Sequence, residues 1–278
     1  MHYRLLALDV DGTLLDPNGT LRPAVHQAVT ATKQRGLHVT LCTGRRFRTA
    51  LPIAQTLELE HPLIVHNGAL VKDPASGDTL QQRYMPHDVY HQGLALLRRL
   101  STPMVYIDAF HEHVDILTES IEQAHPLQRA YLQDNLEHCH IVTDIDTPPL
   151  QGVVMMSIMA DEPSLHTLRA QIVVALGERV RVNILASKIY GGHILEILHP
   201  AVSKWQALQQ LAARMGIAPE AVVAVGDDHN DLEMIRHAGL GIAMGNAPPA
   251  VKAVADYVTG SNAEDGLTQA LAHFVLHA

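Results

Sequence analysis

The segment Leu5-Leu6-Ala7-Leu8-Asp9-Val10-Asp11-Gly12-Thr13 decides the fold and directs the search for a site. Its apolar half predicts a buried strand, because a strand covered on both faces reads as a continuous apolar run. The run ends in two aspartates two positions apart, and alternate positions of a strand point to the same side. Like charges held together disfavour each other's ionisation, so a cation or a reaction would explain them. A strand end followed by an Asp-Gly turn is the alternative that packing alone offers.

Strand-like and helix-like patterns alternate on both sides of a different middle region. Such alternation predicts an α/β fold in which helices cover a parallel sheet. The strand-like runs are 3–9, 38–42, 63–66, 222–225 and 241–244, and the helix-like ones are 22–35, 46–58, 203–215, 231–237 and 264–276.

The middle of the chain predicts a second domain, inserted into the first. There, helix-like segments 87–100, 119–133 and 163–176 are separated by short β-type runs. Strands interleaved with single helices are typical of an α+β layer with an open-faced antiparallel sheet. We expect the boundaries near Met85-Pro86 and Gly191-Gly192, which gives 1–84 and 192–278 for the core and 85–191 for the insertion.

Composition and charge limit the classes of protein. The chain has 278 residues, enough for two hydrophobic cores. Its 29 acidic and 20 basic residues give a net charge of −9, which argues against a nucleic-acid partner. No apolar run reaches the ~18 residues that span a bilayer, so we expect no membrane partner. Two distant cysteines and the lack of a signal-peptide layout predict a cytoplasmic protein. A monomer and a homodimer are both compatible with the sequence.

Three further segments at predicted strand or helix ends carry chemistry. Thr43-Gly44-Arg45 offers a hydroxyl and backbone N–H groups to an anion, although Thr-Gly is also a common helix start. Gly226-Asp227-Asp228-His229-Asn230-Asp231 has more carboxylates than a helix cap requires. Lys204 begins a helix, where its charge opposes the helix dipole and an anionic partner would explain it. A solvated surface lysine is the alternative, and Lys188 is a competing candidate within the strand-rich middle region.

In this order and spacing, these motifs resemble those of the haloacid dehalogenase superfamily. His66-Asn67-Gly68-Ala69, Leu195-Glu196-Ile197 and Gly241-Ile242-Ala243-Met244-Gly245-Asn246-Ala247 point to its Cof-type (class IIB) phosphatases. The resemblance covers essentially the whole core. It implies a Rossmann-like, doubly wound parallel sheet and an inserted α/β cap domain that selects the substrate. Trp205 departs from the branch, which usually has a small residue after the lysine.

The resemblance implies a Mg²⁺-dependent phosphatase that hydrolyses small phosphate esters, sugar phosphates first, through an aspartyl-phosphate. Asp9 would be the nucleophile. Asp11 would be the general acid and base, with a pKa raised by crowded acidic surroundings. The Asp9 carboxylate, the Asp11 backbone carbonyl and the Asp227 carboxylate would hold Mg²⁺. A phosphosugar mutase and a non-catalytic regulator that binds phosphorylated metabolites remain the alternatives.

The remaining roles follow from the same resemblance. Asp231 would orient Lys204 or a metal-bound water, and Asn67 would line the site or only cap a turn. The phosphoryl oxygens would be held by Thr43, the Gly44 amide, Lys204 and Asn230. Polar residues near predicted strands of the cap are candidates for substrate selection, with a solvated or locally bonded side chain as the alternative for each. These candidates are Asp108, His113, Asn183 and Tyr190.

Overall fold

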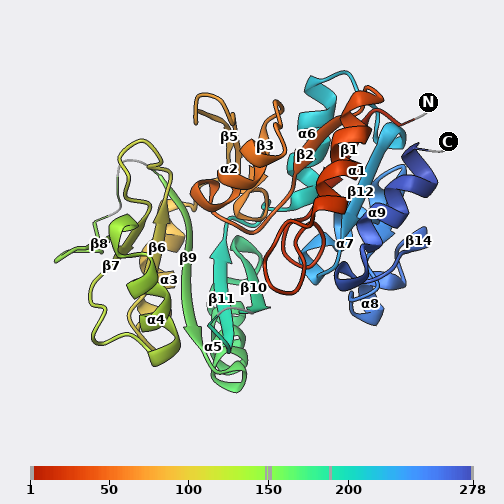
Figure 1. The fold of residues 1–278 in the computed structure, drawn as a ribbon. Helices are drawn as coiled ribbons and strands as arrows, with labels where there is room; N and C mark the ends of the chain where they lie inside the picture. The colour runs from red at the N-terminus through yellow and green to blue at the C-terminus, as the bar shows by residue number, and fades with distance from the viewer. Residues whose placement is uncertain (1–2, 148, 150–151, 188–189, 277–278) are drawn as a thin grey trace. The chain divides into compact units, whose positions relative to one another are not determined.

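The computed structural model describes residues 3–147, 149, 152–187 and 190–276, so Lys188 lies outside the described residues. The chain divides into two compact units (Figure 1). The first consists of Met1–Gln81 and Ser203–Ala278, and the second of Gln82–Val202. The second unit therefore interrupts the first in the sequence.

Five parallel strands form the central sheet of the first unit. They are β1 (Leu5–Leu8), β2 (His38–Leu41), β12 (Val222–Gly226), β13 (Leu240–Ala243) and β14 (Tyr257–Val258). Their order is β14-β13-β12-β1-β2, so β1 has a neighbour on each side and all four of its residues are buried. Leu8 is in register with Val225 of β12 and with Leu41 of β2. The three strands therefore end at the same edge of the sheet.

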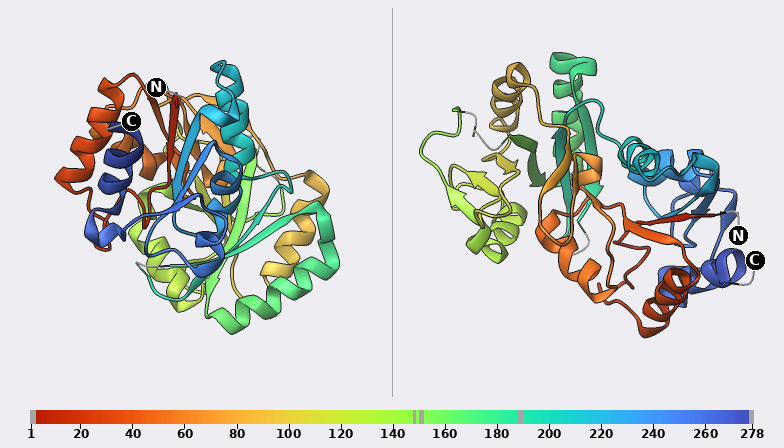
Figure 2. Two further views of the ribbon diagram at one scale, coloured as in Figure 1. Left: turned by 90° about the vertical axis from the view of Figure 1, so that its right-hand side faces the viewer. Right: turned by 90° about the horizontal axis from the view of Figure 1, so that it is seen from above.

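Helices cover both faces of this sheet. They are α1 (Pro23–Gln34), α2 (Phe47–Thr56), α6 (Lys204–Arg214), α7 (Leu232–His237), α8 (Pro249–Lys252) and α9 (Gly266–Leu271). Leu208 of α6 packs in one core cluster with Leu5 and Val222 of the strands. Figure 2 shows α6 on this side of the sheet and the pair α1 and α9 on the other. This is the doubly wound arrangement that the alternating pattern predicts.

The first unit also contains a small three-stranded sheet, whose first turn carries Asn67 toward the site. It consists of β3 (Leu63–Val65), β4 (Leu70–Lys72) and β5 (Thr79–Gln82). The tight turn between β3 and β4 puts Asn67 and Gly68 at φ values of 58° and 96°. A Cβ atom on Gly68 would lie 2.3 Å from the carbonyl oxygen of Ser203. Only glycine therefore lets this turn pack against the start of α6.

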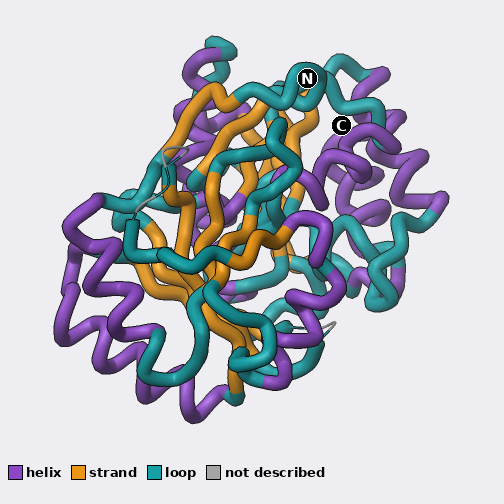
Figure 3. The backbone as a smooth tube through the Cα atoms, turned by 90° about the vertical axis from the view of Figure 1, so that its left-hand side faces the viewer, coloured by secondary structure: helices purple, strands orange, loops and turns teal. Residues whose placement is uncertain are grey.

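The second unit is an α+β layer built on one six-stranded sheet (Figure 3, strands in orange). In spatial order the strands are β10 (Arg181–Ala186), β11 (His193–Leu198), β9 (Val153–Ala160), β6 (Met104–Ile107), β7 (Ile116–Thr118) and β8 (Cys139–Ile141). All neighbours are antiparallel except β7 and β8. Its helices are α3 (His87–Leu97), α4 (Pro126–Asp134) and α5 (Glu162–Leu176). Residues of α3 and α5 form one core with β9 and β11.

Two expectations for this region are corrected. Residues 192–202 were assigned to the core, but β11 pairs with both β9 and β10 and belongs to the sheet of the second unit. The helix expected over 119–133 begins only at Pro126, since proline is favoured in the first turn and disfavoured within a helix. Every helix in the described part of the chain is too short or too polar to cross a bilayer.

Candidate active site

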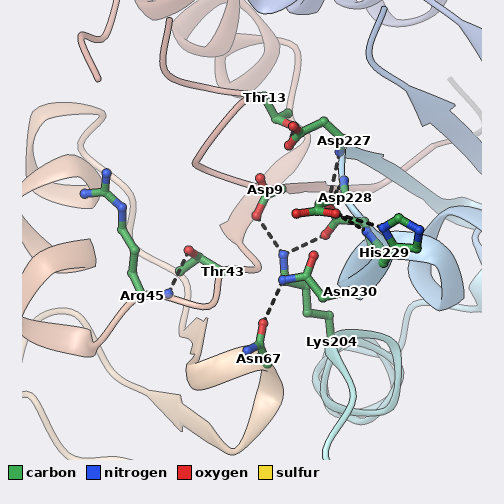
Figure 4. A network of polar contacts seen from close by, with 11 residues as sticks. Asp9, Thr13, Thr43, Arg45, Asn67, Lys204, Asp227, Asp228, His229 and Asn230 are labelled. Atoms are coloured by element: carbon green, nitrogen blue, oxygen red, sulfur yellow. Dashed lines mark hydrogen bonds and ion pairs between the residues drawn. The ribbon is translucent and has the colours of Figure 1, made fainter. Parts of the chain in front are cut away.

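The carboxyl ends of β1 and β12 bring two carboxylates together. Asp9 follows β1 directly and Asp227 follows β12, and both side chains are buried. The two strands are parallel with Leu8 level with Val225, so Asp9 lies level with Gly226 and Asp227 follows one residue further on. Thr43 lies near the same edge, two residues after the end of β2 (Figure 4). Residues separated by more than 200 positions in the sequence thus meet at one place.

Lys204 ties the nucleophile candidate to a third carboxylate. Its ammonium Nζ lies 2.7 Å from Asp9 Oδ1 and 2.6 Å from Asp231 Oδ1, and the side chain is 1% exposed. Burial alone would lower the pKa of Lys204, but the charges and hydrogen bonds of Asp231 and Asp9 outweigh it and raise the pKa above its usual value. The lysine is therefore a fixed positive charge inside the site, as Figure 4 shows.

The three buried carboxylates carry more charge than one lysine can balance. Burial raises the pKa of Asp9 well above its usual value, and the charges of Asp231 and Asp227 add to the effect while Lys204 opposes it. Carboxylate oxygens of Asp9, Asp227 and Asp231 lie within 4.8 Å of one another. A set of carboxylate oxygens without sulfur or imidazole suits a hard divalent cation. The group therefore fits a cation such as Mg²⁺.

Both carboxylate oxygens of Asp231 accept hydrogen bonds from neighbouring groups of the site. Its Oδ2 accepts hydrogen bonds from the backbone N–H groups of Asp227 and Asp228, both at 3.0 Å, and its Oδ1 accepts from Lys204. A Cβ atom on Gly226 would lie 2.5 Å from the Asp231 carboxyl carbon, so this fold of the loop requires glycine. Asp231 therefore has the contacts of a residue that orients Lys204.

Asp227 is fixed by groups from two other loops. Thr13 Oγ1 donates to its Oδ1 at 3.2 Å, and Asn246 Nδ2 donates to its Oδ2 at 3.0 Å. Gly12 has a φ of 94°, and a Cβ atom there would lie 2.1 Å from Asp227 Oδ2. The Asp-Gly pair after β1 is thus more than a turn signal, because the missing side chain makes room for a carboxylate.

Asp11 lies in surroundings other than those expected. The sequence predicted a crowded acidic environment, yet the side chain is 48% exposed and forms a two-pronged ion pair with Arg45. Arg45 Nε and Nη2 each donate to one carboxylate oxygen at 2.7 Å. The Arg45 side chain extends away from the Lys204 cluster in Figure 4. The physical reason is the exposure of Asp11, which lets its side chain turn toward a guanidinium.

The expected phosphate-binding residues lie together beside this cluster. Thr43 is buried, and its Oγ1 accepts from the Arg45 backbone N–H at 3.1 Å, which leaves its own hydroxyl hydrogen to donate. Asn230 Nδ2 donates to Asn67 Oδ1 at 2.8 Å, so the two amides join the turn after β3 to the loop after β12. Asn230 Oδ1 is buried and has no hydrogen-bond partner among the described residues. A Cβ atom on Gly44 would lie 3.1 Å from Asn67 Oδ1.

The cap candidates lie in the second unit and are engaged within it. Asp108 accepts from the Tyr84 hydroxyl at 2.8 Å, and Asn183 Nδ2 donates to Glu196 Oε2 at 3.2 Å. The Tyr190 ring lies edge-on to Tyr131, with centroids 5.4 Å apart. His113 is exposed, and its carbonyl accepts from the His138 ring. Each of these four candidates therefore has a neighbour of its own in this unit.

Two residues of the sequence motifs have contacts in the site that the motifs alone do not predict. Arg45 pairs with Asp11, and Asn246 contacts Asp227. The only signal in the sequence was their position inside Thr43-Gly44-Arg45 and after Gly245. Neither spacing nor periodicity tells how far such a side chain reaches across the fold.

Comparisons with known proteins agree with this arrangement. A family model described as haloacid dehalogenase-like hydrolase matches residues 6–271. The HMP-PP phosphatase of Cronobacter sakazakii is 31% identical over 99% of this chain and 95% of its own length. The pyridoxal phosphate phosphatase YbhA of Escherichia coli is 30% identical over 97% of both chains. The crystal structure of a haloacid dehalogenase-like hydrolase from Bacteroides thetaiotaomicron matches with a TM-score of 0.82 and 26% identity, over 97% of this chain and 98% of that one.

Proposed function

This chain belongs to the haloacid dehalogenase-like hydrolases and is a phosphoric monoester hydrolase, and from that membership we propose a Mg²⁺-dependent phosphatase of small phosphorylated metabolites. Sugar phosphates are the first substrate class of this proposal. The reaction proceeds through an aspartyl-phosphate on Asp9. The observation that carries the proposal is the placement of Asp9, buried at the end of β1 with the Lys204 ammonium 2.7 Å from its Oδ1.

In the first step a carboxylate oxygen of Asp9 attacks phosphorus. A phosphorus–oxygen bond to Asp9 forms while the ester bond to the leaving alcohol breaks, and Asp11 gives its proton to the leaving oxygen. In the second step Asp11 takes a proton from water, which attacks phosphorus, releases inorganic phosphate and regenerates Asp9. Because Asp11 is paired with Arg45 in the structure, its side chain must leave that pair to transfer a proton.

The cation site of the proposal consists of the Asp9 and Asp227 carboxylates and the Asp11 backbone carbonyl. When bound, Mg²⁺ supplies positive charge that offsets the repulsion between a carboxylate and an anionic ester. The excess of buried carboxylates over the single ammonium of Lys204 supports this assignment. Asp231 keeps Lys204 in place through the 2.6 Å contact.

The phosphoryl oxygens would be bound by the groups beside this cluster. The Thr43 hydroxyl, the Gly44 amide and the Lys204 ammonium supply donors, and positioned donors lower the barrier of phosphoryl transfer. Asn230 joins them, and its buried Oδ1 without a partner among the described residues supports a ligand contact there. Asn67 lines the site and holds Asn230 through their 2.8 Å hydrogen bond.

Substrate selection in this proposal belongs to the second unit. Its candidates Asp108, Asn183 and Tyr190 offer hydrogen-bonding groups, which suit a ligand rich in hydroxyls. The relatives' names give different substrates, a pyridoxal phosphate in one and HMP-PP in another, so they do not choose the ester. We place the enzyme in the cytoplasm because its two cysteines, Cys42 and Cys139, lie far apart in the sequence, a pattern that suits a reducing compartment.

The test is phosphate release from a panel of sugar phosphates, nucleotides, pyridoxal phosphate and flavin mononucleotide, with Mg²⁺ and with a chelator. We expect release that requires Mg²⁺ and is fastest for sugar phosphates. Release that is unchanged by the chelator would contradict the cation assignment. Isomerisation of hexose phosphates without release would identify a mutase, and binding without turnover would identify a regulator. Light scattering during the same preparation distinguishes monomer from homodimer.

A further inference from the structure

We propose that Asn246 is a positioning residue of the cation site, an inference that rests on the proposed function. Asn246 follows β13 by three residues. Its Nδ2 donates to the Gly12 carbonyl oxygen at 2.9 Å and to Asp227 Oδ2 at 3.0 Å. Its Oδ1 accepts from the Asn262 backbone N–H at 3.0 Å. One amide therefore joins the loop after β1, the carboxylate after β12 and a C-terminal segment.

The contact with Asp227 fixes how the carboxylate is turned. A carboxylate on a short side chain rotates about its last bond unless both oxygens are held. Thr13 holds Oδ1 and Asn246 holds Oδ2, so the plane of the carboxylate is set by two donors from different loops. Because a carboxylate oxygen has two lone pairs, one such hydrogen bond is compatible with binding of a cation by the same oxygen. Groups that orient a ligand in this way commonly change metal affinity when they are removed.

The contact with Gly12 fixes the other side of the same site. The Gly12 carbonyl is one peptide beyond the Asp11 carbonyl that the proposal assigns to Mg²⁺. Because one nitrogen of Asn246 bonds both Gly12 and Asp227, it sets the separation of the two strand ends that supply the ligands. Asparagine suits this place because its amide donates two hydrogen bonds and accepts a third. Aspartate could not donate, and alanine could do neither.

Asn262 supplies a matched control, since it anchors the same loop without touching Asp227. Its Nδ2 donates to the Leu15 carbonyl at 2.8 Å, three residues beyond Gly12. Asn262→Ala removes that side-chain contact and leaves its backbone N–H to bond Asn246. If Asn246 only held the loop in place, the two alanine variants would have similar effects on the protein.

The experiment titrates Mg²⁺ alone against the melting temperature of the full chain, without substrate, in the parent, Asn246→Ala and Asn262→Ala. We expect the Mg²⁺ concentration for half-maximal stabilisation to rise about tenfold or more in Asn246→Ala and to stay within about twofold in Asn262→Ala. Activity assays add a second readout. Asn246→Ala should lose activity at limiting Mg²⁺ and regain it at high Mg²⁺, with an unchanged KM for the ester.

Three outcomes would overturn the inference. An unchanged Mg²⁺ titration in Asn246→Ala contradicts it alone, and so does an equal shift in both variants. A parent protein that Mg²⁺ does not stabilise contradicts the cation step of the proposed function, and the inference with it. If Asn246→Ala shows no cooperative unfolding in chelator, Asn246→Ser is judged by the same criteria.

Discussion

Two clusters of charged side chains, one in each unit, differ in their exposure to water. In the first unit Asp9, Lys204 and Asp231 are buried and bonded to one another from distant segments. In the second unit Arg98 pairs with Glu119 and Asp146 at the surface, with side chains that are 32%, 33% and 57% exposed. Water screens the second set and not the first. The comparison shows that clusters of three charges can be buried in one unit and exposed in the other, and we expect the two to differ in their effects on activity and stability.

The largest effect that this comparison predicts is on turnover. Asp9→Asn removes the attacking oxygen, and loss of a nucleophile costs on the order of 10⁴-fold or more in kcat. The fold should survive, because the change relieves crowding among buried carboxylates and Lys204 keeps Asp231 as a partner. The measurement is kcat at saturating Mg²⁺, with the melting temperature beside it.

Asp228→Asn is the matched control for this variant. Asp228 belongs to the same acidic run as Asp227, but its side chain is 44% exposed and accepts hydrogen bonds from His229. Its kcat should stay within about threefold of the parent, since exposed side chains away from reacting atoms contribute little. An equal fall in kcat in Asp9→Asn and Asp228→Asn would contradict the expectation that the buried carboxylate matters more for turnover than the more exposed one.

The second effect is on stability of the first unit. Lys204→Met leaves Asp9 and Asp231 buried without their cation, and breaking a buried pair costs about 3–5 kcal/mol. Trp205 is the only tryptophan of the chain and lies next to Lys204, so its fluorescence reports urea unfolding of this unit. In the double variant Lys204→Met/Asp9→Asn part of the loss should be recovered. A fall in the free energy of unfolding of less than about 1 kcal/mol in Lys204→Met would mean that this buried cluster contributes no more than an exposed ion pair.

The third effect is on substrate binding by the second unit. Asn183→Ala should raise KM for the best phosphate ester of the panel less than about tenfold, because one hydrogen bond to a neutral group is worth about 1 kcal/mol. kcat and the Mg²⁺ dependence should not change. Gln171→Ala, at an exposed position bonded to Arg99, is the control and should alter neither constant. A large fall in kcat for Asn183→Ala would mean that the second unit takes part in the chemistry.

The fourth effect tests the surface cluster directly. Arg98→Met removes the common partner of Glu119 and Asp146, yet exposed pairs contribute less than about 1 kcal/mol. The expected change in the free energy of unfolding is therefore small, and it should shrink further at high salt. Circular dichroism during urea unfolding measures it, since the tryptophan lies in the other unit. A loss as large as that of Lys204→Met would refute the contrast between the units.

The smallest effect is a pH dependence remote from the catalytic cluster. His38 Nδ1 lies 2.7 Å from His61 Nε2 at the amino end of β2. Partial burial lowers the pKa of His61, and the charge of His38 adds to it. The folded state thus favours the neutral ring, so its stabilisation is complete above the ordinary pKa of about 6.5 and is lost as the pH falls below it.

Because His61 is partly exposed, this loss should be about 0.5 kcal/mol or less. It should be absent in His61→Gln, which keeps a polar side chain of similar size and does not titrate. The measurement is the free energy of unfolding of both proteins at pH 5 and pH 7. The same pH dependence in both proteins would assign the titration to another group.

Local patterns explain what the sequence predicted well. The apolar run before Asp9 and the one before Asp227 each predict a strand that ends in carboxylates, and parallel strands bring their carboxyl ends together. The family, the α/β fold and the class of reaction follow from these motifs and are confirmed by the comparisons. The roles of single residues in the site stay predictions until the variants are measured.

Contacts between distant residues explain what the sequence could not predict. The run from His193 to Leu198 reads the same whether it pairs inside the first or the second unit, and only the pairing with β9 and β10 decides. Asp11 was expected among acidic groups, yet a guanidinium 34 positions away turned its side chain outward. The contact of Asn246 could not be predicted either, because the spacing of residues in the sequence does not indicate that its amide bonds the Gly12 carbonyl.

The position of β1 in the sheet has a consequence for how the protein is made. β1 lies between β2 and β12, and its partner residues in β12 follow it by roughly 200 positions. During synthesis at about 5–20 residues per second, one edge of β1 therefore stays without its native partner for some ten seconds or more. The whole inserted unit emerges from the ribosome in that interval. In that interval another nascent chain could pair with the unpaired backbone groups along this edge of β1, so the order of the segments creates a risk of aggregation.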